Sequence, residues 1–460
     1  MLSINHAKLF AELEWEYRKA KAIEAGPDAW KRTQPLLLIG PSGAGKTEAA
    51  KEYLNTRKRG LYFSFKNVSS HLALKLFTDM HPEIFTECSS WDDYFYQLDE
   101  CLGHRYYSSL VFDDVDFSTM DESFELSLRR FLERHSSRNV FVIIISRRAA
   151  VVEDEYVSFI LPSLTMGEIS KAFPKYSDID KMRLAALTDA LPGLIKYFDP
   201  TVSLRSNLGK LLGGSDFFSY AEKRYKDSFR TAESYSALLH GMSVGKHRLT
   251  ELSDYSGYPP NKTDKYLKAL IDADLVSARE VDSLDGRTRR GYYIKSSYMD
   301  LWVRYSMNGV DTDDIDELAE RMLSQVDTEY IPVFFKRLCN IWIKKHASKI
   351  YGHSIRLDDK ESLNQTVGGI TFNCVQHDGD RMLFIKIWDD VSETHGEADY
   401  AEIEKAVTSV NNFYNSHIVL CSINRFRESM WKQTKDYANV HLMETRFMMT
   451  GDVRWDIGIQ

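Results

Sequence analysis

The sequence has little of what builds a disulfide framework, a zinc site or a membrane anchor. Its five cysteines, in 460 residues, are scattered, odd in number and never spaced as CxxC, which argues against the first two. The longest apolar runs, such as residues 140–145 and 36–39, are far below the roughly 20 residues that cross a bilayer. The N-terminus, MLSINHAKLFAELEWEYRK, becomes charged too early for a signal peptide. We therefore expect a soluble, cytoplasmic protein with no membrane partner.

The composition also lacks a biased tract and an excess of positive charge. The chain is 43% hydrophobic, 12% aromatic and 27% charged, which is typical of globular proteins. Its length favours about three domains of ordinary size. Its formal net charge of −8 means that any contact with nucleic acid would depend on a local basic surface.

The arrangement of apolar segments predicts an α/β fold in the first third of the chain. Short β-rich runs alternate there with helical stretches, at residues 36–39, 61–65, 109–113, 140–145 and 157–161. Strands separated by helices imply a parallel sheet. The pattern is helical from about 165 to 228. Three short helices and a two-strand hairpin follow up to about 300, and the remainder mixes helices with strands around 370–375 and 382–388.

A phosphate-binding motif stands between the first apolar strand and a helix predicted over residues 47–55. The motif consists of Gly40, Pro41, Ser42, Gly43, Ala44, Gly45, Lys46 and Thr47, and it fits the P-loop pattern at every defined position. The glycines let backbone N–H groups surround phosphate oxygens, and the helix N-terminus adds partial positive charge. We expect Lys46 to reach the β- and γ-phosphates of ATP and the Thr47 hydroxyl to bind Mg²⁺. The alternative is a chance glycine turn.

The segment SLVFDD, residues 109–114, has the layout of a Walker B strand, an apolar strand that ends in two carboxylates. We expect Asp113 to hold Mg²⁺ through water, because a hard cation that faces phosphate favours an oxygen anion. Asp114 stands where many such ATPases carry a glutamate that polarises the attacking water. The alternative for this pair is an aspartate-rich turn at the end of a strand.

The apolar run 140–145 ends in Ser146, Arg147 and Arg148. A further buried strand between the P-loop strand and the Walker B strand defines the additional-strand class of P-loop proteins, in which a polar residue at its end senses the γ-phosphate. Ser146 fits that role. A guanidinium binds phosphate with two parallel hydrogen bonds, and of the two arginines we favour Arg147 as the γ-phosphate contact. The alternative is that both arginines only cap the strand in solvent.

Residues 36–200 resemble the archaeal-type P-loop ATPases and the related signal-transducing switch ATPases of the AAA+ class. The resemblance rests on LLLIGPSGAGKT, SLVFDDVDF, VIIISRR, FILPSLT at 159–165 and ALPGL at 190–194. In that group a Gly-x-Pro motif in the lid places its proline against the adenine. Pro192 matches the proline, and Ala190 stands where the glycine would be. The alternative for Pro192 is a proline that starts a helix.

The second block extends this resemblance to a winged helix. Helices predicted over 235–241, 248–257 and 260–273 precede strands at 275–280 and 291–295. The third helix and the wing offer a local basic surface suited to DNA phosphates. Its members are Lys262, Lys265, Lys268, Arg287, Arg289 and Arg290. The alternative is that this helix, which also carries Asp264 and Asp272, is simply solvated.

The third block resembles the restriction-endonuclease-like domain of the same family, which carries an aspartate on one strand and Glu-x-Lys on the next. Lys386 and Trp388 remain here, but Phe384 replaces the acid and Asn373 replaces the aspartate. Cleavage of a phosphodiester needs carboxylates that hold a metal ion. We therefore expect an inactive domain. The alternative is a migrated site built from nearby acids, which are Asp378, Asp380, Asp389 and Asp390.

These observations predict an N-terminal helical segment at 1–34, a P-loop ATPase core at 35–164, a helical lid at 165–228, a winged helix at 229–310 and a nuclease-like domain at 311–460. The function that they favour is a switch ATPase that binds ATP with Mg²⁺ and hydrolyses it slowly. The alternative is an ATP-regulated DNA-binding protein that acts through the winged helix, and an ATP-dependent nuclease is less favoured. The sequence leaves the protein partner open.

Overall fold

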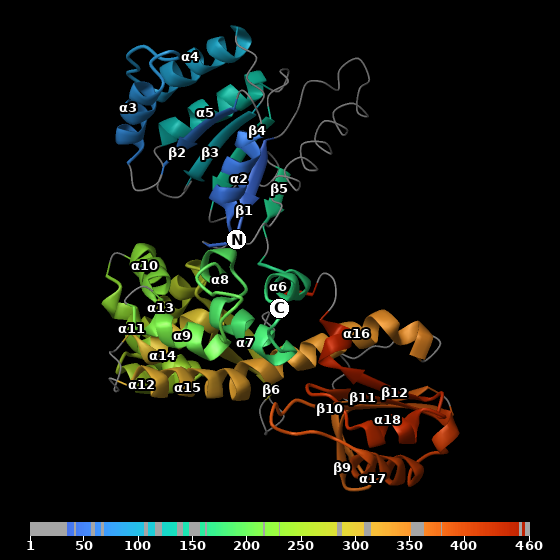
Figure 1. Ribbon diagram of the computed structural model, residues 1–460. Coiled ribbons are helices and arrows are strands. Elements are labelled where there is room, and N and C mark those ends of the chain that lie inside the picture. The colour runs from blue at the N-terminus through green and yellow to red at the C-terminus, as the bar shows by residue number, and fades with distance from the viewer. Residues whose placement is uncertain are drawn as a thin grey trace. The chain divides into compact units, whose positions relative to one another are not determined.

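The computed structural model of this chain (Figure 1) divides into two compact units, residues 1–162 and 163–460, and each is described here by itself. The described residues are 35–40, 43–56, 60–65, 69–104, 109–115, 122–135, 141–146, 157–161, 163–214, 217–229, 231–282, 288–307, 314–350, 363–378, 380–449 and 453–455. The helical segment predicted at 1–34 lies outside them, as do Pro41, Ser42, Arg147, Arg148 and Arg287. The five-part domain division remains a prediction.

The first unit contains a five-stranded parallel sheet. Its strands are β1 (Leu36–Ile39), β2 (Gly60–Ser64), β3 (Ser109–Val115), β4 (Phe141–Ser146) and β5 (Val157–Ile160). Their order is β2-β3-β4-β1-β5, and each neighbouring pair is parallel. The strand β4 therefore lies between β1 and β3, as the sequence predicted. The sheet is covered on both faces, which explains why β1, β3 and β4 are apolar along nearly their whole length.

Helices cover both faces of this sheet, so the two faces of β3 contact different helices. Helices α3 (Ser70–Met80), α4 (Trp91–His104) and α5 (Glu122–His135) share one core with Leu110 and Phe112 of β3. On the other face lies α2 (Lys46–Asn55), whose Tyr53 hydroxyl is 3.0 Å from Ser109 Oγ of β3. Since strand side chains alternate, Ser109 and Asp113 both face α2.

The second unit begins with the helical stretch that the sequence predicted. It contains α6 (Met166–Ala172), α7 (Asp178–Thr188), α8 (Pro192–Ile195), α9 (Leu204–Leu212) and α10 (Ser219–Ser228). A capping box starts α6, because the Thr165 side chain accepts from the Glu168 N–H at 3.1 Å and Glu168 accepts from the Thr165 N–H at 2.7 Å.

Three helices and a hairpin follow, at the positions expected from the sequence. They are α11 (Glu233–Ser243), α12 (Leu249–Ser256) and α13 (Pro260–Asp272), then β6 (Val276–Asp282) and β7 (Thr288–Ile294). The two strands pair antiparallel, with Val276 opposite Ile294. The helix α14 (Ser297–Tyr305) comes next.

A partly buried aspartate connects the turn before α8 to the start of α14. Asp189 and Ala190 both have left-handed backbone angles, with φ of 50° and 52°. The Asp189 carboxylate accepts from the Ser296 hydroxyl, from the Ser297 hydroxyl at 2.9 Å and from the Tyr298 N–H at 3.3 Å. Burial raises the pKa of Asp189, and these three hydrogen bonds oppose that shift. Ala190 thus occupies a position that favours glycine, which is the residue that the family resemblance implies there.

We predict that Asp189→Ala lowers the free energy of unfolding by about 3 kcal/mol, because it removes three hydrogen bonds to a carboxylate and deprives the buried Tyr298 N–H of its acceptor. The control is Asp274→Ala. Asp274 is also left-handed, with φ of 59°, but it is exposed and holds surface ion pairs with Lys295 and Arg224. Asp274→Ala should lower the free energy of unfolding by about 1 kcal/mol or less. Chemical denaturation of the two variants measures this, and equal losses would contradict the structural role of Asp189.

The remainder of the second unit joins a long helical segment to a mixed sheet. The helix α15 (Ile315–Gln325) continues through one π-helical turn, η3 (Val326–Tyr330), into α16 (Ile331–Ile350). The strands are β8 (Leu363–Val367), β9 (Ile370–Asp378), β10 (Arg381–Trp388), β11 (Ser416–Ser422) and β12 (Val440–Glu444). They are ordered β12-β11-β10-β9-β8, antiparallel from β8 to β10 and parallel from β10 to β12.

Three helices and a 3₁₀ turn alternate with or follow the last strands of this second sheet. They are α17 (Glu397–Thr408), the 3₁₀ turn η5 (Phe413–Asn415), α18 (Glu428–Thr434) and α19 (Thr445–Met448). The helices α17 and α18 share a core with Phe372, Phe384 and Ile418 of the sheet. Within the described ranges of the whole chain, no helix combines the length and the apolar character that a membrane crossing requires.

Candidate nucleotide-binding site

The glycines of the 40–47 motif have backbone angles that few other residues adopt. Gly43 and Gly45 are left-handed, with φ of 81° and 91°, and Gly45 is the residue that caps the N-terminus of α2. Gly40 has φ of 152°, and a Cβ atom there would lie 2.8 Å from the carbonyl oxygen of Leu161. The space is closed because the Leu161 N–H donates to the Ile39 carbonyl at 2.8 Å. This turn therefore requires glycine for both angle and space.

Lys46 lies inside this turn. Its side chain is buried, with 8% of the residue exposed, and its Nζ donates to the Gly40 carbonyl at 2.5 Å. The side chain of Lys46 thus folds back, and its ammonium group contacts the first residue of the motif. Thr47 follows in the first turn of α2 and is partly exposed. The first N–H groups of this helix and its partial positive charge lie at the same end, which suits a phosphate group.

Asp113 is held on both of its carboxylate oxygens. Its Oδ2 accepts from the Tyr62 hydroxyl of β2 at 2.6 Å, and its Oδ1 accepts from the Asp114 N–H at 2.7 Å. Only 3% of Asp113 is exposed. The residue lies toward the carboxyl end of β3 and faces α2. Because β1, β3 and β4 are parallel, this end is at the same edge of the sheet as the motif.

Asp114 occupies a bulge. Its φ of 58° is left-handed, and the pairing of β3 with β4 shifts register between Phe112 and Val115. Aspartate tolerates this backbone region better than most residues. Bulges near a strand end turn side chains out of the regular alternation, and they occur often beside functional sites. The sequence placed Asp114 after Asp113 but gave no sign of this angle.

Ser146 completes the edge. It is the last residue of β4, is 2% exposed, and lies opposite Val115 of β3. The carboxyl ends of β1, β3 and β4 therefore bring Gly40, Asp113 and Ser146 to one edge of the sheet. In open α/β sheets, ligands bind outside the carboxyl ends of the strands. Arg147, the predicted γ-phosphate contact, lies outside the described residues.

Tyr62 also lies at this edge, and it is not among the residues predicted from the sequence. The alternation of β2, with burial pattern iBiBi, places Tyr62 and Ser64 on one face, and Ser64 lies opposite Asp113 in the sheet register. The alternation of β2 and the position of Tyr62, two residues before the strand ends, could therefore have predicted that its side chain points to the same face as Ser64. Its contact with Asp113 depends on the pairing of β2 with β3, which the sequence does not specify.

The remaining predicted residues lie in the second unit. Pro192 is the first residue of α8, the position described by the helix-start alternative. Of the basic residues, Lys262 Nζ lies 4.0 Å from the ring centre of Tyr258, Lys265 is exposed, and Lys268 forms an ion pair with Asp264 at 2.8 Å. The Arg290 guanidinium lies 5.6 Å from the Tyr292 ring centre. The Arg289 side chain is outside the description.

The residues at the nuclease-like positions make contacts within the second sheet. Phe384 is fully buried, and its ring centre lies 5.2 Å from that of Phe372. Lys386 Nζ donates to the Thr371 carbonyl at 2.8 Å, and burial lowers the pKa of Lys386. The Asn373 Oδ1 atom accepts from the Ile387 N–H at 2.7 Å. Of the acids considered as replacements, Asp389 pairs with Lys336 at 2.8 Å, and Asp390 accepts from Ser392.

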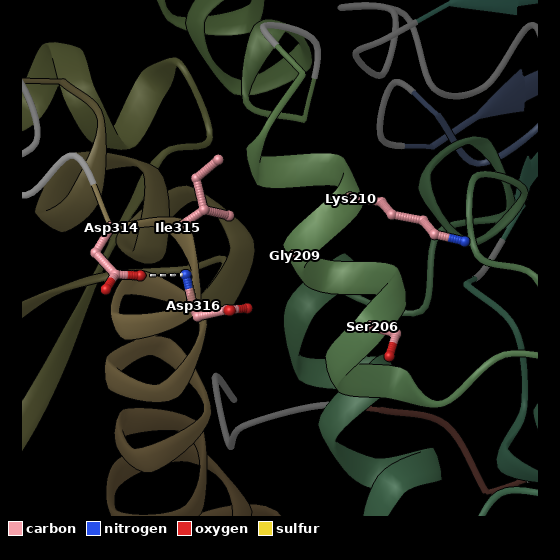
Figure 2. Close-up of a pocket in the computed structure, with 6 residues that line it drawn as sticks. All are labelled: Ser206, Gly209, Lys210, Asp314, Ile315 and Asp316. Carbon is pink, nitrogen blue, oxygen red and sulfur yellow. Dashed lines mark hydrogen bonds between the residues drawn. The ribbon is translucent and has the colours of Figure 1, made fainter.

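Among the described residues, no group of three or more histidine, cysteine or acidic side chains is placed to hold a metal ion. A groove of about 780 Å³ lies in the second unit between α9 and the start of α15. Figure 2 shows Asp314 and Asp316 on one side of it and Ser206 and Lys210 on the other. None of the predicted site residues lines this groove.

Comparison with known proteins gives distant similarities. No protein-family model matches the chain. It is 20% identical, over 289 residues, to the uncharacterized protein MJECL04 of Methanocaldococcus jannaschii, a match that covers 59% of this chain and 63% of the relative. The chain thus matches less than two thirds of that relative's length.

Three solved structures are similar at lower levels. The Aeropyrum pernix ORC1 protein in complex with DNA is 14% identical, with a TM-score of 0.34 over 68% of this chain and 92% of that one. The RuvB protein of Thermotoga maritima is 13% identical, with a TM-score of 0.31 over 61% and 90%. The AMPPCP-bound DnaA of Aquifex aeolicus is 15% identical, with a TM-score of 0.27 over 55% and 87%.

The first unit has the fold of a P-loop NTPase core. Its sheet order, with β4 between β1 and β3, and the glycine turn that joins β1 to α2 define this fold.

Proposed function

We propose that this chain is an ATPase that binds ATP with Mg²⁺ through residues 40–47 and uses slow hydrolysis as a molecular switch. The observation that carries the proposal is the placement of the Lys46 ammonium within a turn of left-handed glycines. Asp113 and Ser146 end two parallel strands at the same edge of the sheet. A turn that leads into a helix N-terminus suits a polyphosphate better than a neutral ligand.

The oxygen donors at this edge fit magnesium. A hydroxyl and a carboxylate are hard ligands, and Mg²⁺ in nucleotide sites is held by one or two such groups together with phosphate oxygens. In the proposal Thr47 binds the ion directly and Asp113 holds it through water. When bound, the ion neutralises charge on the β- and γ-phosphates. Lys46 and the backbone N–H groups of residues 43–47 hold and orient the phosphates.

Three further residues have proposed roles at the γ-phosphate. Asp114 orients the attacking water, Ser146 detects the γ-phosphate, and Arg147 donates to it. Support for Asp114 comes from the bulge that takes it out of the regular strand alternation. Support for Ser146 comes from its burial at the end of β4. Pro192, in the predicted lid, is proposed to contact the adenine.

We predict slow turnover, of order one per minute or less, compared with roughly 10 per second for a median enzyme. An aspartate side chain is one methylene shorter than glutamate, so the Asp114 carboxylate should stand too far from the attacking water, and small misplacements are costly. Release of phosphate from ATP by the purified chain, at saturating ATP and Mg²⁺, measures the rate. A steady-state rate above about 1 per second would contradict the switch.

The switch itself requires that ATP and ADP favour different conformations, because a ligand shifts an equilibrium only by its differential affinity for the two states. We propose that the predicted lid and winged helix open and close against the ATPase core. Small-angle scattering with a non-hydrolysable ATP analogue and with ADP tests this. Identical profiles at saturation with both nucleotides would contradict a conformational switch.

DNA binding through residues 229–310 is the second candidate. It is favoured by Lys262 and Lys265, which are both exposed on α13. The Lys262 Nζ lies 4.0 Å from the ring centre of Tyr258 and 5.3 Å from that of Tyr266. It is disfavoured by the ion pair that engages Lys268 with Asp264. Binding to duplex DNA measured against salt concentration discriminates the two candidates, because contacts with phosphates make affinity fall steeply with salt.

We propose that the predicted nuclease-like domain does not cut nucleic acid. The phenyl ring of Phe384 cannot bind a metal ion, and it is buried against Phe372. The contacts of Lys386 and Asn373 with main-chain groups of the same sheet suit a structural role. The strands would then persist as a packing or binding surface.

A further inference from the structure

A tyrosine on the neighbouring strand contacts the carboxylate that is proposed to hold magnesium. The Tyr62 hydroxyl lies 2.6 Å from Asp113 Oδ2, on the face of the sheet that carries α2. The Lys51 Nζ of α2 lies 5.2 Å from the centre of the same ring. Ser64, two residues further on β2, lies opposite Asp113 in the sheet register. The hydroxyl of Tyr62 thus contacts β3, and its ring faces a side chain of α2.

The hydroxyl can only donate to Asp113 while it keeps its proton. Burial raises the pKa of Tyr62 above its usual value, and the hydrogen bond to Asp113 raises it further. A carboxylate oxygen accepts more than one hydrogen bond, so Asp113 Oδ2 keeps capacity for a water molecule of a metal ion.

Two hydrogen bonds, one to each oxygen, hold the Asp113 carboxylate in a single orientation. The Asp114 N–H holds Oδ1 at 2.7 Å, and the Tyr62 hydroxyl holds Oδ2. Without Tyr62 the carboxylate would rotate about its Cβ–Cγ bond with only one restraint. Groups that orient a metal-binding side chain typically change metal affinity by 10- to 100-fold when they are removed.

We propose that Tyr62 is a positioning residue for magnesium binding by Asp113. The inference rests on the proposed function, since it concerns the same ion. It assigns Tyr62 no contact with the nucleotide and none with the reacting atoms.

The test is Tyr62→Phe, which removes the hydroxyl and keeps the ring. Binding of a fluorescent ATP analogue is measured as Mg²⁺ is increased, and again with EDTA present. We expect the Mg²⁺ concentration at half-saturation to rise about tenfold, the lower end of the range for such residues. Affinity for the analogue in EDTA should stay unchanged. If Tyr62 only stabilised the fold, Tyr62→Phe would change the Mg²⁺ dependence and the affinity in EDTA together.

The matched control is Tyr53→Phe. The Tyr53 hydroxyl also bonds to β3, at Ser109 Oγ, on the same face of the same strand but four residues before Asp113. This variant should leave the dependence on Mg²⁺ unchanged. If Tyr62→Phe does not fold, Tyr62→His keeps a ring with an N–H donor at this position and should shift the Mg²⁺ dependence in the same direction, by a smaller factor.

The outcomes separate this inference from the proposed function. If the unaltered chain binds no nucleotide, the proposed function fails. If it binds the analogue with Mg²⁺ and the Mg²⁺ dependence of Tyr62→Phe equals that of the unaltered chain, only the role of Tyr62 is overturned. An equal shift in Tyr53→Phe and Tyr62→Phe would likewise overturn it, because the effect would then come from general loosening of β3.

Discussion

Lys46→Ala is expected to lower the affinity of this chain for ATP by roughly two orders of magnitude and to remove turnover. The Lys46 ammonium is buried within the glycine turn, where its Nζ lies 2.5 Å from the Gly40 carbonyl. Hydrogen bonds to charged groups contribute about 1.5–3 kcal/mol each, and about 1.4 kcal/mol corresponds to tenfold in affinity. Calorimetric titration measures the binding, and phosphate release measures the turnover.

The control for this variant is Lys75→Ala. Lys75 is exposed on α3, which packs on the face of the sheet opposite α2. It removes the same side chain from the same unit without touching the motif, so affinity and turnover should be unchanged. If Lys46→Ala also left both quantities unchanged, the phosphate-binding role of residues 40–47 would be wrong.

Asp113→Asn should reduce turnover by roughly 10²-fold or more while affinity for the nucleotide falls much less. The amide keeps the size of the side chain and an oxygen that can accept from Tyr62, but it removes the negative charge that favours Mg²⁺. Loss of one preorganised electrostatic group in an active site typically costs 10²–10³ in rate. The measurement compares steady-state turnover with nucleotide affinity at the same Mg²⁺ concentration.

Asp92→Asn is the control for this change. Asp92 lies at the start of α4 and forms an exposed ion pair with Arg130 at 3.0 Å, so its neutralisation alters only the surface. Turnover of Asp92→Asn should equal that of the unaltered chain. Equal turnover of Asp113→Asn at saturating Mg²⁺ would exclude Asp113 from the magnesium site.

The sheet of the first unit could be predicted because its signals are local. An apolar strand followed by a glycine motif specifies β1 and the start of α2, and apolar runs that end in polar residues specify β3 and β4. The order β2-β3-β4-β1-β5 agrees with the expectation that β4 separates β1 from β3. The positions of Lys46, Asp113 and Ser146 at one edge follow from that order.

The contacts at this edge could not be predicted in the same way. The left-handed angle of Asp114 depends on a register shift between β3 and β4. The hydrogen bond of Tyr62 with Asp113 depends on which residues lie opposite each other in β2 and β3. Both are properties of paired strands, which a single sequence does not specify.

In the second unit the elements were predictable but their special features were not. The sequence indicated three helices and a hairpin, and it identified Phe384 as a replacement for an acid. It did not indicate the π-helical turn Val326–Tyr330, because residue patterns distinguish such a turn poorly from the α-helix on either side. It also contained no indication of the hydrogen bonds that Asp189 accepts from the start of α14, since more than 100 residues separate the partners.

The most direct test of the account is the titration of the unaltered, full chain with ATP in the presence of Mg²⁺. Isothermal calorimetry should give saturable binding with one ATP per chain, and the affinity should fall when EDTA removes the metal ion. Absence of saturable binding up to millimolar ATP would contradict the central claim that residues 40–47 form a nucleotide site.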